Sequence, residues 1–276
     1  MSLTKLRTPA GAEALQAILA HPEHTLVGLD FDGTLSSIVD DPEQAYADPA
    51  AVAALGQLGE LVAKVVVITG RPTRQVVRLG RLAGVPGLGR MTVLGQYGVE
   101  RWNAEGDEYS QPPEPPEIEQ ILAELPGLLS SLDLEDALIE HKGRAVGVHT
   151  RTMPHPGVAF ARLADPIRDL AQRYGLTVEP GKNVWEIRAL GVDKGVVLRN
   201  MVVETGARHV IFAGDDLGDL PAFRAALALR EEGMAALLVC SASREEDALA
   251  EISDLVVDGP AGITGWLTDL VDTLRR

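Results

Sequence analysis

Short runs of aliphatic, mostly β-branched residues recur in both halves of this chain, and helical patterns separate them. The runs are bounded by glycine or polar residues, which is typical of strands buried on both faces of a parallel sheet. They cover residues 26–29, 65–68, 91–94, 209–213, 237–240 and 255–257. Apolar residues at helical spacing occupy 50–63, 72–82, 220–229 and 262–274. This alternation predicts an α/β fold whose core is a doubly wound, mainly parallel sheet.

The middle of the chain follows a different pattern, which begins with the run Pro-Pro-Glu-Pro-Pro at 112–116. Such a run is stiff and extended, so it is a natural linker. A helix, a hairpin, a second helix and a second hairpin are predicted after it, at 117–132, 137–151, 157–174 and 176–188. Because core-type strands resume afterwards, we predict a smaller inserted α+β domain. The predicted bounds are 1–110 and 190–276 for the core, and 111–189 for the insert.

Composition narrows the range of partners. The chain has 276 residues, of which 46% are hydrophobic, so it can bury a large core, and its single cysteine excludes an internal disulfide. A net charge of −15 repels phosphate backbones and anionic lipid. We therefore expect neither nucleic acid nor a membrane as partner. We also predict no secretory signal and no membrane span, and expect a cytoplasmic protein.

Two carboxylates, Asp30 and Asp32, directly follow the first predicted strand. In an open parallel sheet, ligands bind at the carboxyl ends of the strands, so both acids can face one ligand there. The next residue, Gly33, lets the backbone turn sharply, and Thr34 offers a hydroxyl and an amide to a phosphate. This spacing favours a reacting pair, although a simple loop or helix cap is the alternative for the pair alone.

A calcium-binding loop is a second alternative, because an EF-hand also begins with Asp-x-Asp. The EF-hand requires a third ligand at loop position 5, glycine at position 6 and glutamate at position 12. This chain has Thr34, Leu35 and Asp41 at those positions. The spacing therefore excludes an EF-hand.

A second acidic cluster follows the predicted strand 209–213 and contains Asp215, Asp216 and Asp219. Taken alone, it can be a helix N-cap with acidic residues in the first turn. Its place at a second strand end, however, lets it converge with the first acidic pair. Convergent carboxylates repel each other unless a cation lies between them, and Mg²⁺ prefers such oxygen ligands. We therefore predict a Mg²⁺ site.

Polar and basic residues stand at two further element ends. Thr69 follows the strand 65–68 and can hydrogen-bond a phosphoryl oxygen, although the segment alone is explained as a strand-to-helix turn. Lys194 stands where the core pattern resumes. A lone lysine is usually a solvated surface residue, but beside these acids it supplies the cation that a phosphate needs. Gly33, Thr34 and Arg71 complete the predicted substrate-binding set of the core.

Four signals now follow one another along the chain: the acidic pair at 30–32, Thr69, Lys194 and the acidic cluster at 215–219. In this order they resemble the haloacid dehalogenase superfamily, and the resemblance covers nearly the whole chain. The resemblance implies a phosphatase in which Asp30 is the nucleophile and forms an aspartyl-phosphate. Asp32 is then the general acid and later the base, while Thr69 and Lys194 hold the phosphoryl group. The implied Mg²⁺ ligands are Asp30, the main-chain carbonyl of Asp32, and Asp215, supported by Asp216 and Asp219. The insert stands where that superfamily carries a C2 cap, which closes over the core and excludes water.

Charged residues gather on the two predicted hairpins of the insert. Acid and base on one strand face can bind several sugar hydroxyls, whereas ordinary cross-strand ion pairing is the alternative for each residue alone. The charged residues of the hairpins lie in or beside the runs 140–142, 148–151 and 181–188. Together, these runs resemble the trehalose-6-phosphate phosphatase family. The resemblance implies that the non-phosphorylated glucose binds Glu140, Lys142, Arg151, Lys182 and Glu186.

The resemblance implies hydrolysis of the small-molecule sugar phosphate trehalose 6-phosphate to trehalose and phosphate, in trehalose biosynthesis, with a functional link to a trehalose-phosphate synthase. Related phosphatases acting on sucrose phosphate or mannosyl-phosphoglycerate stay open as alternatives, as does a catalytically silent sugar-phosphate sensor. One departure concerns residues 95–98, where the family usually carries Gly-x-His-Gly and this chain has Gly-Gln-Tyr-Gly. A metal pair at His141 and His149 is disfavoured, because Mg²⁺ prefers oxygen ligands.

Overall fold

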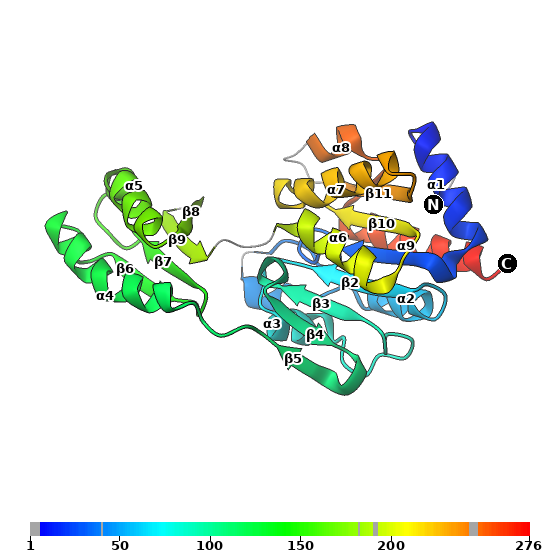
Figure 1. The fold of residues 1–276 in the computed structure, drawn as a ribbon, viewed down its shortest axis with the longest axis horizontal. Coiled ribbons are helices and arrows are strands. Elements are labelled where there is room, and N and C mark those ends of the chain that lie inside the picture. Colours follow the sequence, from blue (N-terminus) through cyan, green and yellow to red (C-terminus); the bar gives the residue numbers. More distant parts are fainter. Residues whose placement is uncertain (1–5, 40, 182, 190–192, 243–247) are drawn as a thin grey trace. The chain divides into compact units, whose positions relative to one another are not determined.

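The computed structural model of the chain describes residues 6–39, 41–181, 183–189, 193–242 and 248–276 (Figure 1). Contacts divide it into two compact units. The first, called the core below, combines Met1–Gln111 with Val192–Arg276, and the second, called the cap, is Pro112–Gly191.

An eight-stranded sheet forms the centre of the core, in the order β12-β11-β10-β1-β2-β3-β4-β5. The strands from β12 to β3 are parallel to their neighbours, and β4 and β5 extend the sheet in antiparallel pairings. The parallel strands are β1 (Thr25–Leu29), β2 (Lys64–Ile68), β3 (Thr92–Gly95), β10 (His209–Gly214), β11 (Ala235–Ala242) and β12 (Leu255–Asp258). The antiparallel ones are β4 (Glu100–Asn103) and β5 (Glu108–Ser110).

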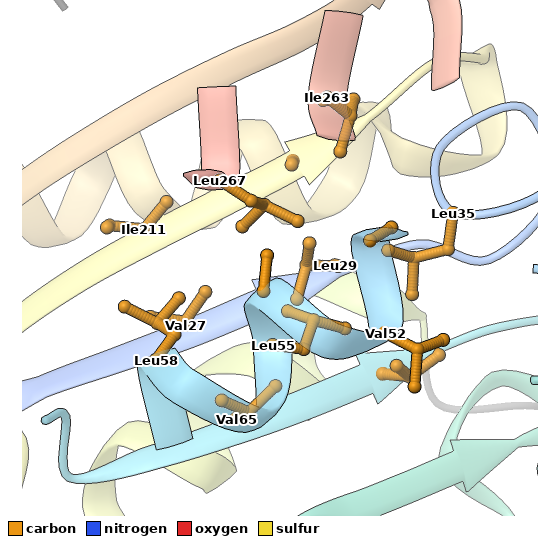
Figure 2. Close-up of a cluster of buried hydrophobic side chains, with 14 of the residues drawn as sticks. Val27, Leu29, Leu35, Val52, Leu55, Leu58, Val65, Ile211, Ile263 and Leu267 are labelled. Atoms are coloured by element: carbon orange, nitrogen blue, oxygen red, sulfur yellow. The ribbon is translucent and has the colours of Figure 1, made fainter. Parts of the chain in front are cut away.

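Two layers of helices cover the faces of this sheet, which makes its strands apolar on both sides. Val27 and Leu29 pack into one buried cluster, and Leu26 packs into the other, because successive side chains of a strand point to opposite faces. The first layer contains α1 (Pro9–Ala20), α2 (Pro49–Gly59), α3 (Thr73–Gly80) and α9 (Gly259–Leu274). The second contains α6 (Lys194–Thr205), α7 (Leu220–Glu231) and α8 (Ala248–Ile252). Figure 2 shows the first cluster, where Leu55 of α2 and Leu267 of α9 meet β1.

The cap is a four-stranded antiparallel sheet with two helices on one face. Its strand order is β6-β7-β9-β8, and Val146, Val148 and Ile187 pack with the helices into a third buried cluster. The opposite face of the same strands carries mainly polar side chains. The elements are α4 (Pro116–Ser131), β6 (Leu138–His141), β7 (Ala145–His149), α5 (Pro156–Arg173), β8 (Leu176–Gly181) and β9 (Val184–Ala189).

The predicted α/β class with a parallel core sheet is confirmed, but the sequence patterns do not predict helices α1, α6 and α8 or strands β4 and β5. The helix predicted over 50–63 ends at Gly59, because Gly56 and Gly59 are poor helix formers near its end. Strand β4 was not predicted, since only Trp102 of its residues is buried and the apolar pattern is weak. Among the described residues, no helix has both the length and the apolar character needed to cross a membrane.

Candidate active site

Four predicted site residues meet at the carboxyl ends of β1 and β10. Asp30 directly follows β1, Asp215 directly follows β10, Asp219 lies in the next turn, and Lys194 is the first residue of α6. The Nζ atom of Lys194 donates to Oδ1 of Asp30 at 2.6 Å and to Oδ1 of Asp219 at 2.7 Å. All four side chains are buried, so these interactions are screened little by water.

The charges in this cluster are unbalanced. Burial and the nearby Asp219 carboxylate raise the pKa of Asp30, and burial with the acids Asp216 and Asp219 raises the pKa of Asp215 to about 7. Burial alone would lower the pKa of Lys194, but Asp30 and Asp219 raise it well above its usual value. The three carboxylates of Asp30, Asp215 and Asp219 against one ammonium leave a formal charge of −2.

The donor set in this cluster fits a hard divalent cation. Asp30, Asp215 and Asp219 each offer a carboxylate oxygen, and these oxygens lie within 4.8 Å of one another. Oxygen ligands of this kind suit Mg²⁺, whose charge would cancel the surplus.

Gly33 lets the two acidic loops approach each other. Its φ of 70° is in the left-handed region, and a Cβ at this position would lie 1.9 Å from Oδ2 of Asp215. The carbonyl oxygen of Gly33 accepts a hydrogen bond of 2.6 Å from Oγ of Ser241, at the end of β11. The next residue, Thr34, is fully buried, and its hydroxyl has no hydrogen-bond partner among the described residues. A bound group can satisfy that hydroxyl.

Arg71 contacts the predicted general acid through two hydrogen bonds. Its Nε donates to Oδ2 of Asp32 at 2.6 Å, and its Nη2 donates to Oδ1 at 2.7 Å. Its Nη1 donates to the carbonyl oxygen of Pro42 at 2.7 Å. The buried hydroxyl of Thr69 accepts from the backbone N–H of Arg71 at 3.1 Å. The guanidinium therefore orients Asp32, and a direct contact between Arg71 and substrate stays a prediction.

Asp216 lies apart from the buried cluster. Its side chain is exposed, and its Oδ1 accepts a hydrogen bond of 2.9 Å from the backbone N–H of Gly218. This bond caps the short turn Leu217–Asp219. A supporting role of Asp216 at a metal stays a prediction.

The polar face of the cap sheet brings three of the predicted sugar-binding residues together. Nζ of Lys142 lies 2.8 Å from Oε2 of Glu186 and 3.6 Å from Oε2 of Glu140. The hydrogen bond to Glu186 contributes to the raised pKa of Lys142 and opposes the effect of burial. Arg151 is exposed in the turn after β7, and Lys182 lies outside the described residues.

The sequence profile of the family described as Trehalose-phosphatase matches residues 28–258. The chain belongs to the trehalose-phosphatase family. It is 31% identical to the trehalose-phosphate phosphatase of Mycobacterium marinum over 95% of this chain and 67% of that protein. It is also 31% identical to that of Mycobacterium avium, over 92% of this chain and 63% of that protein. The chain thus spans about two thirds of the length of these relatives.

A solved structure of a trehalose-phosphatase resembles the whole fold. Trehalose-6-phosphate phosphatase of Aspergillus fumigatus matches with a TM-score of 0.69 at 20% identity, over 95% of this chain and 97% of that one. This likeness concerns the fold. It agrees with the predicted core and inserted domain.

Gln96 and Tyr97 lie in the turn after β3, where the sequence departs from the pattern that the resemblance implies. Tyr97 and Gln96 both have positive φ values, 57° and 46°. The backbone N–H of Tyr97 donates to the carbonyl oxygen of Thr69 at 2.9 Å, and that of Gln96 donates to the carbonyl oxygen of Arg71 at 3.0 Å. Backbone groups of this loop therefore brace the Thr69–Arg71 turn, and these bonds do not depend on which side chain residue 97 carries.

The sequence patterns missed two side chains that contact these candidate site residues. Ser241 supports the Gly33 loop from the end of a buried strand, a location that could have marked it as a site residue. The sequence suggests His149 as part of the run 148–151 and as a disfavoured metal ligand, whereas in the structure its Nε2 lies 2.7 Å from Oε2 of Glu140. Nothing in the one-dimensional pattern relates His149 to Glu140, because they pair diagonally across two strands.

Proposed function

We propose that this chain is a Mg²⁺-dependent phosphatase that hydrolyses trehalose 6-phosphate to trehalose and inorganic phosphate. The observation that carries the proposal is the buried contact between Lys194 and Asp30 at the end of β1, within an oxygen-rich acidic cluster. Membership of the trehalose-phosphatase family supports the choice of substrate. A cytoplasmic location and a functional link to a trehalose-phosphate synthase stay predictions.

The core residues would carry out the reaction in two displacements. A carboxylate oxygen of Asp30 attacks phosphorus, and the bond between phosphorus and the sugar oxygen breaks as the aspartyl-phosphate forms. Lys194 and the hydroxyls of Thr34 and Thr69 hold the phosphoryl oxygens. Water then attacks the aspartyl-phosphate, which releases inorganic phosphate and restores Asp30.

Mg²⁺, held by Asp30, Asp215 and the carbonyl oxygen of Asp32, would neutralise charge on the transferring phosphoryl group. The carboxylate of Asp219 accepts a hydrogen bond from Lys194 and another, of 3.0 Å, from the backbone N–H of Asp215. Asp219 therefore positions both of these residues.

Asp32 would move the protons in both steps. It gives a proton to the departing sugar oxygen, and it then takes one from the attacking water. Arg71 donates one hydrogen bond to each oxygen of Asp32, and each of these oxygens keeps a second lone pair at which it can carry the proton. Arg71 thus orients the acid between turnovers.

The cap would select the leaving group. Glu140, Lys142 and Glu186 lie together on one face of the cap sheet. Sugar hydroxyls can donate hydrogen bonds to the two carboxylates and accept them from the ammonium of Lys142. Arg151 and Lys182 are proposed to join them.

Phosphate release tests the proposal directly. The purified chain is incubated with trehalose 6-phosphate, sucrose 6-phosphate, mannosyl-phosphoglycerate and glucose 6-phosphate, each with Mg²⁺ and with EDTA. We expect the highest kcat/KM on trehalose 6-phosphate and loss of release in EDTA. A tenfold higher kcat/KM on another sugar phosphate would overturn the substrate, equal rates in EDTA would overturn the metal, and no release from any compound would favour a silent sensor.

A further inference from the structure

We infer that His149 is a positioning residue for substrate recognition: its imidazole holds the Glu140 carboxylate in place on the polar face of the cap, where that carboxylate accepts sugar hydroxyls. The inference rests on the proposed function and extends it. It assigns a role to a histidine of the cap that the proposed chemistry of the core does not use.

The contact is built into the cap sheet. His149 is the last residue of β7, and its side chain is only 9% exposed, whereas the side chain of Glu140 on the neighbouring strand β6 is 47% exposed. Nε2 of the buried ring lies 2.7 Å from Oε2 of Glu140. A buried donor therefore binds Oε2 of a carboxylate that reaches solvent.

Gly147 leaves room for the imidazole of His149. The strand register places Gly147 between Glu140 on one side and Glu186 on the other. A Cβ at Gly147 would lie 3.0 Å from Nε2 of His149, which is a tight approach, and 3.5 Å from Oε2 of Glu140, which is an ordinary contact. A side chain there would therefore press on the imidazole. The backbone of Gly147 is not in the left-handed region, so its conformation alone does not require glycine. Glycine weakens a strand interior, so its presence here needs another reason. We attribute it to the room that the missing side chain leaves for the imidazole of His149.

The charges on this face make the orientation of Glu140 matter. Glu140 and Glu186 approach the same ammonium, that of Lys142, at 3.6 Å and 2.8 Å. Without His149, Glu140 can turn fully toward Lys142, and its acceptor oxygens are then occupied there. The hydrogen bond from His149 is also the first cause of a lowered pKa of Glu140, which keeps it an acceptor. A carboxylate held in this way loses less side-chain entropy when a hydroxyl binds.

Substitutions of His149 test the inference, with kcat and KM measured on trehalose 6-phosphate and on p-nitrophenyl phosphate, which has no sugar hydroxyls. We expect His149→Ala to raise KM for the sugar phosphate about tenfold, the effect of losing one hydrogen bond to a charged group, with little change in kcat. The constants for p-nitrophenyl phosphate should stay unchanged. His149→Gln, whose amide can donate from nearly the position of Nε2, should restore most of the affinity.

Two further variants separate positioning from folding. Gly147→Ala keeps both partners but crowds them, so it should raise KM for the sugar phosphate without lowering the Tm. His141→Ala is the matched control, because His141 pairs with Glu114 elsewhere in the cap and should leave KM unchanged. In the double variant with Glu140→Gln, the effect of His149→Ala should largely disappear.

Three outcomes would overturn the inference: an equal loss on both substrates, no recovery in His149→Gln, or full additivity with Glu140→Gln. Its failure is distinguishable from failure of the proposed function. If a different sugar phosphate proves the better substrate, the proposed function is wrong, and the same comparison of KM on that substrate still decides the role of His149.

Discussion

Lys194 links the two acidic loops of the core, since its ammonium contacts Asp30 after β1 and Asp219 after β10. A buried lysine is costly unless its charge is paired, and both partners here are carboxylates. Their attraction keeps Lys194 protonated, with a pKa well above the ordinary value. The proposed nucleophile, Asp30, is therefore held beside a positive charge that can also contact a phosphoryl group.

Replacing the nucleophile tests the residue roles most directly. Asp30→Asn keeps the size of the side chain but removes the attacking oxygen anion, so we expect phosphate release to fall by a factor on the order of 10³ or more. Because Asp219 still pairs with Lys194, the circular dichroism spectrum should not change. Substantial turnover by a folded Asp30→Asn variant would rule out the aspartyl-phosphate route.

Arg71 offers a second test at the residue scale. Its bonds to Asp32 predict that Arg71→Gln lowers kcat by about 10- to 100-fold, part of the ~10²–10⁴ that general acid–base catalysis contributes, with a smaller change in KM. Steady-state kinetics on trehalose 6-phosphate measures this split. Arg78→Gln, which removes an exposed ion pair of α3, is the control. A change confined to KM would instead favour the predicted contact with substrate.

At the scale of elements, the site arises from three chain segments that approach closely. The loop after β1, the loop after β10 and the first turn of α6 meet because β1 and β10 are adjacent parallel strands in register, with Leu29 beside Ala213. Gly33 and Ser241 then hold the first loop in place. The consequence of this convergence is a cluster of buried carboxylates that repel one another.

Stability without metal should therefore depend on pH. Burial and neighbouring acids raise the pKa of Asp215 from 3.8 to about 7, and the pKa values of Asp30 and Asp219 are raised too. The folded state thus binds more protons than the unfolded chain between those values, so the free energy of unfolding should fall as pH rises from about 4 to 7. For one group, a pKa that is higher by 1 in the folded state than in the unfolded chain corresponds to ~1.4 kcal/mol of this free energy.

Thermal unfolding in EDTA and in Mg²⁺, at pH 5 and pH 8, measures this effect. We expect a lower Tm at pH 8 than at pH 5 in EDTA, and a gain from Mg²⁺ that is larger at pH 8, because the cation binds the ionised carboxylates. A Tm that is independent of both pH and Mg²⁺ would contradict the proposed cation site.

The whole molecule carries a net charge of −15, and the proposed substrate is an anion. Long-range repulsion slows their encounter at low salt, where the screening length is ~30 Å at 0.01 M, and fades at 0.15 M, where it is ~8 Å. With Mg²⁺ held constant, we expect kcat/KM to rise about two- to threefold between these ionic strengths. A fall over the same range would mean that the local cations Lys194 and Arg71 dominate the field that the substrate meets.

The sequence by itself determined the α/β class, because strands buried on both faces must be apolar at every position and such runs are visible in one dimension. It also marked the acids Asp30, Asp32 and Asp215, since each directly follows a strand whose end is an expected ligand site. The insert was visible as a change of pattern after the prolines. Local spacing was enough for all of these.

Only the tertiary structure decided which of these side chains touch. The contacts of Lys194 with Asp30 and Asp219 join residues 164 and 25 positions apart, and the bonds of Arg71 to Asp32 span 39. The pair of His149 and Glu140 joins neighbouring strands, beside a glycine whose missing side chain leaves room for the imidazole. Such contacts follow from strand register and close backbone approach, which no local pattern encodes, because they are set by how distant segments pack.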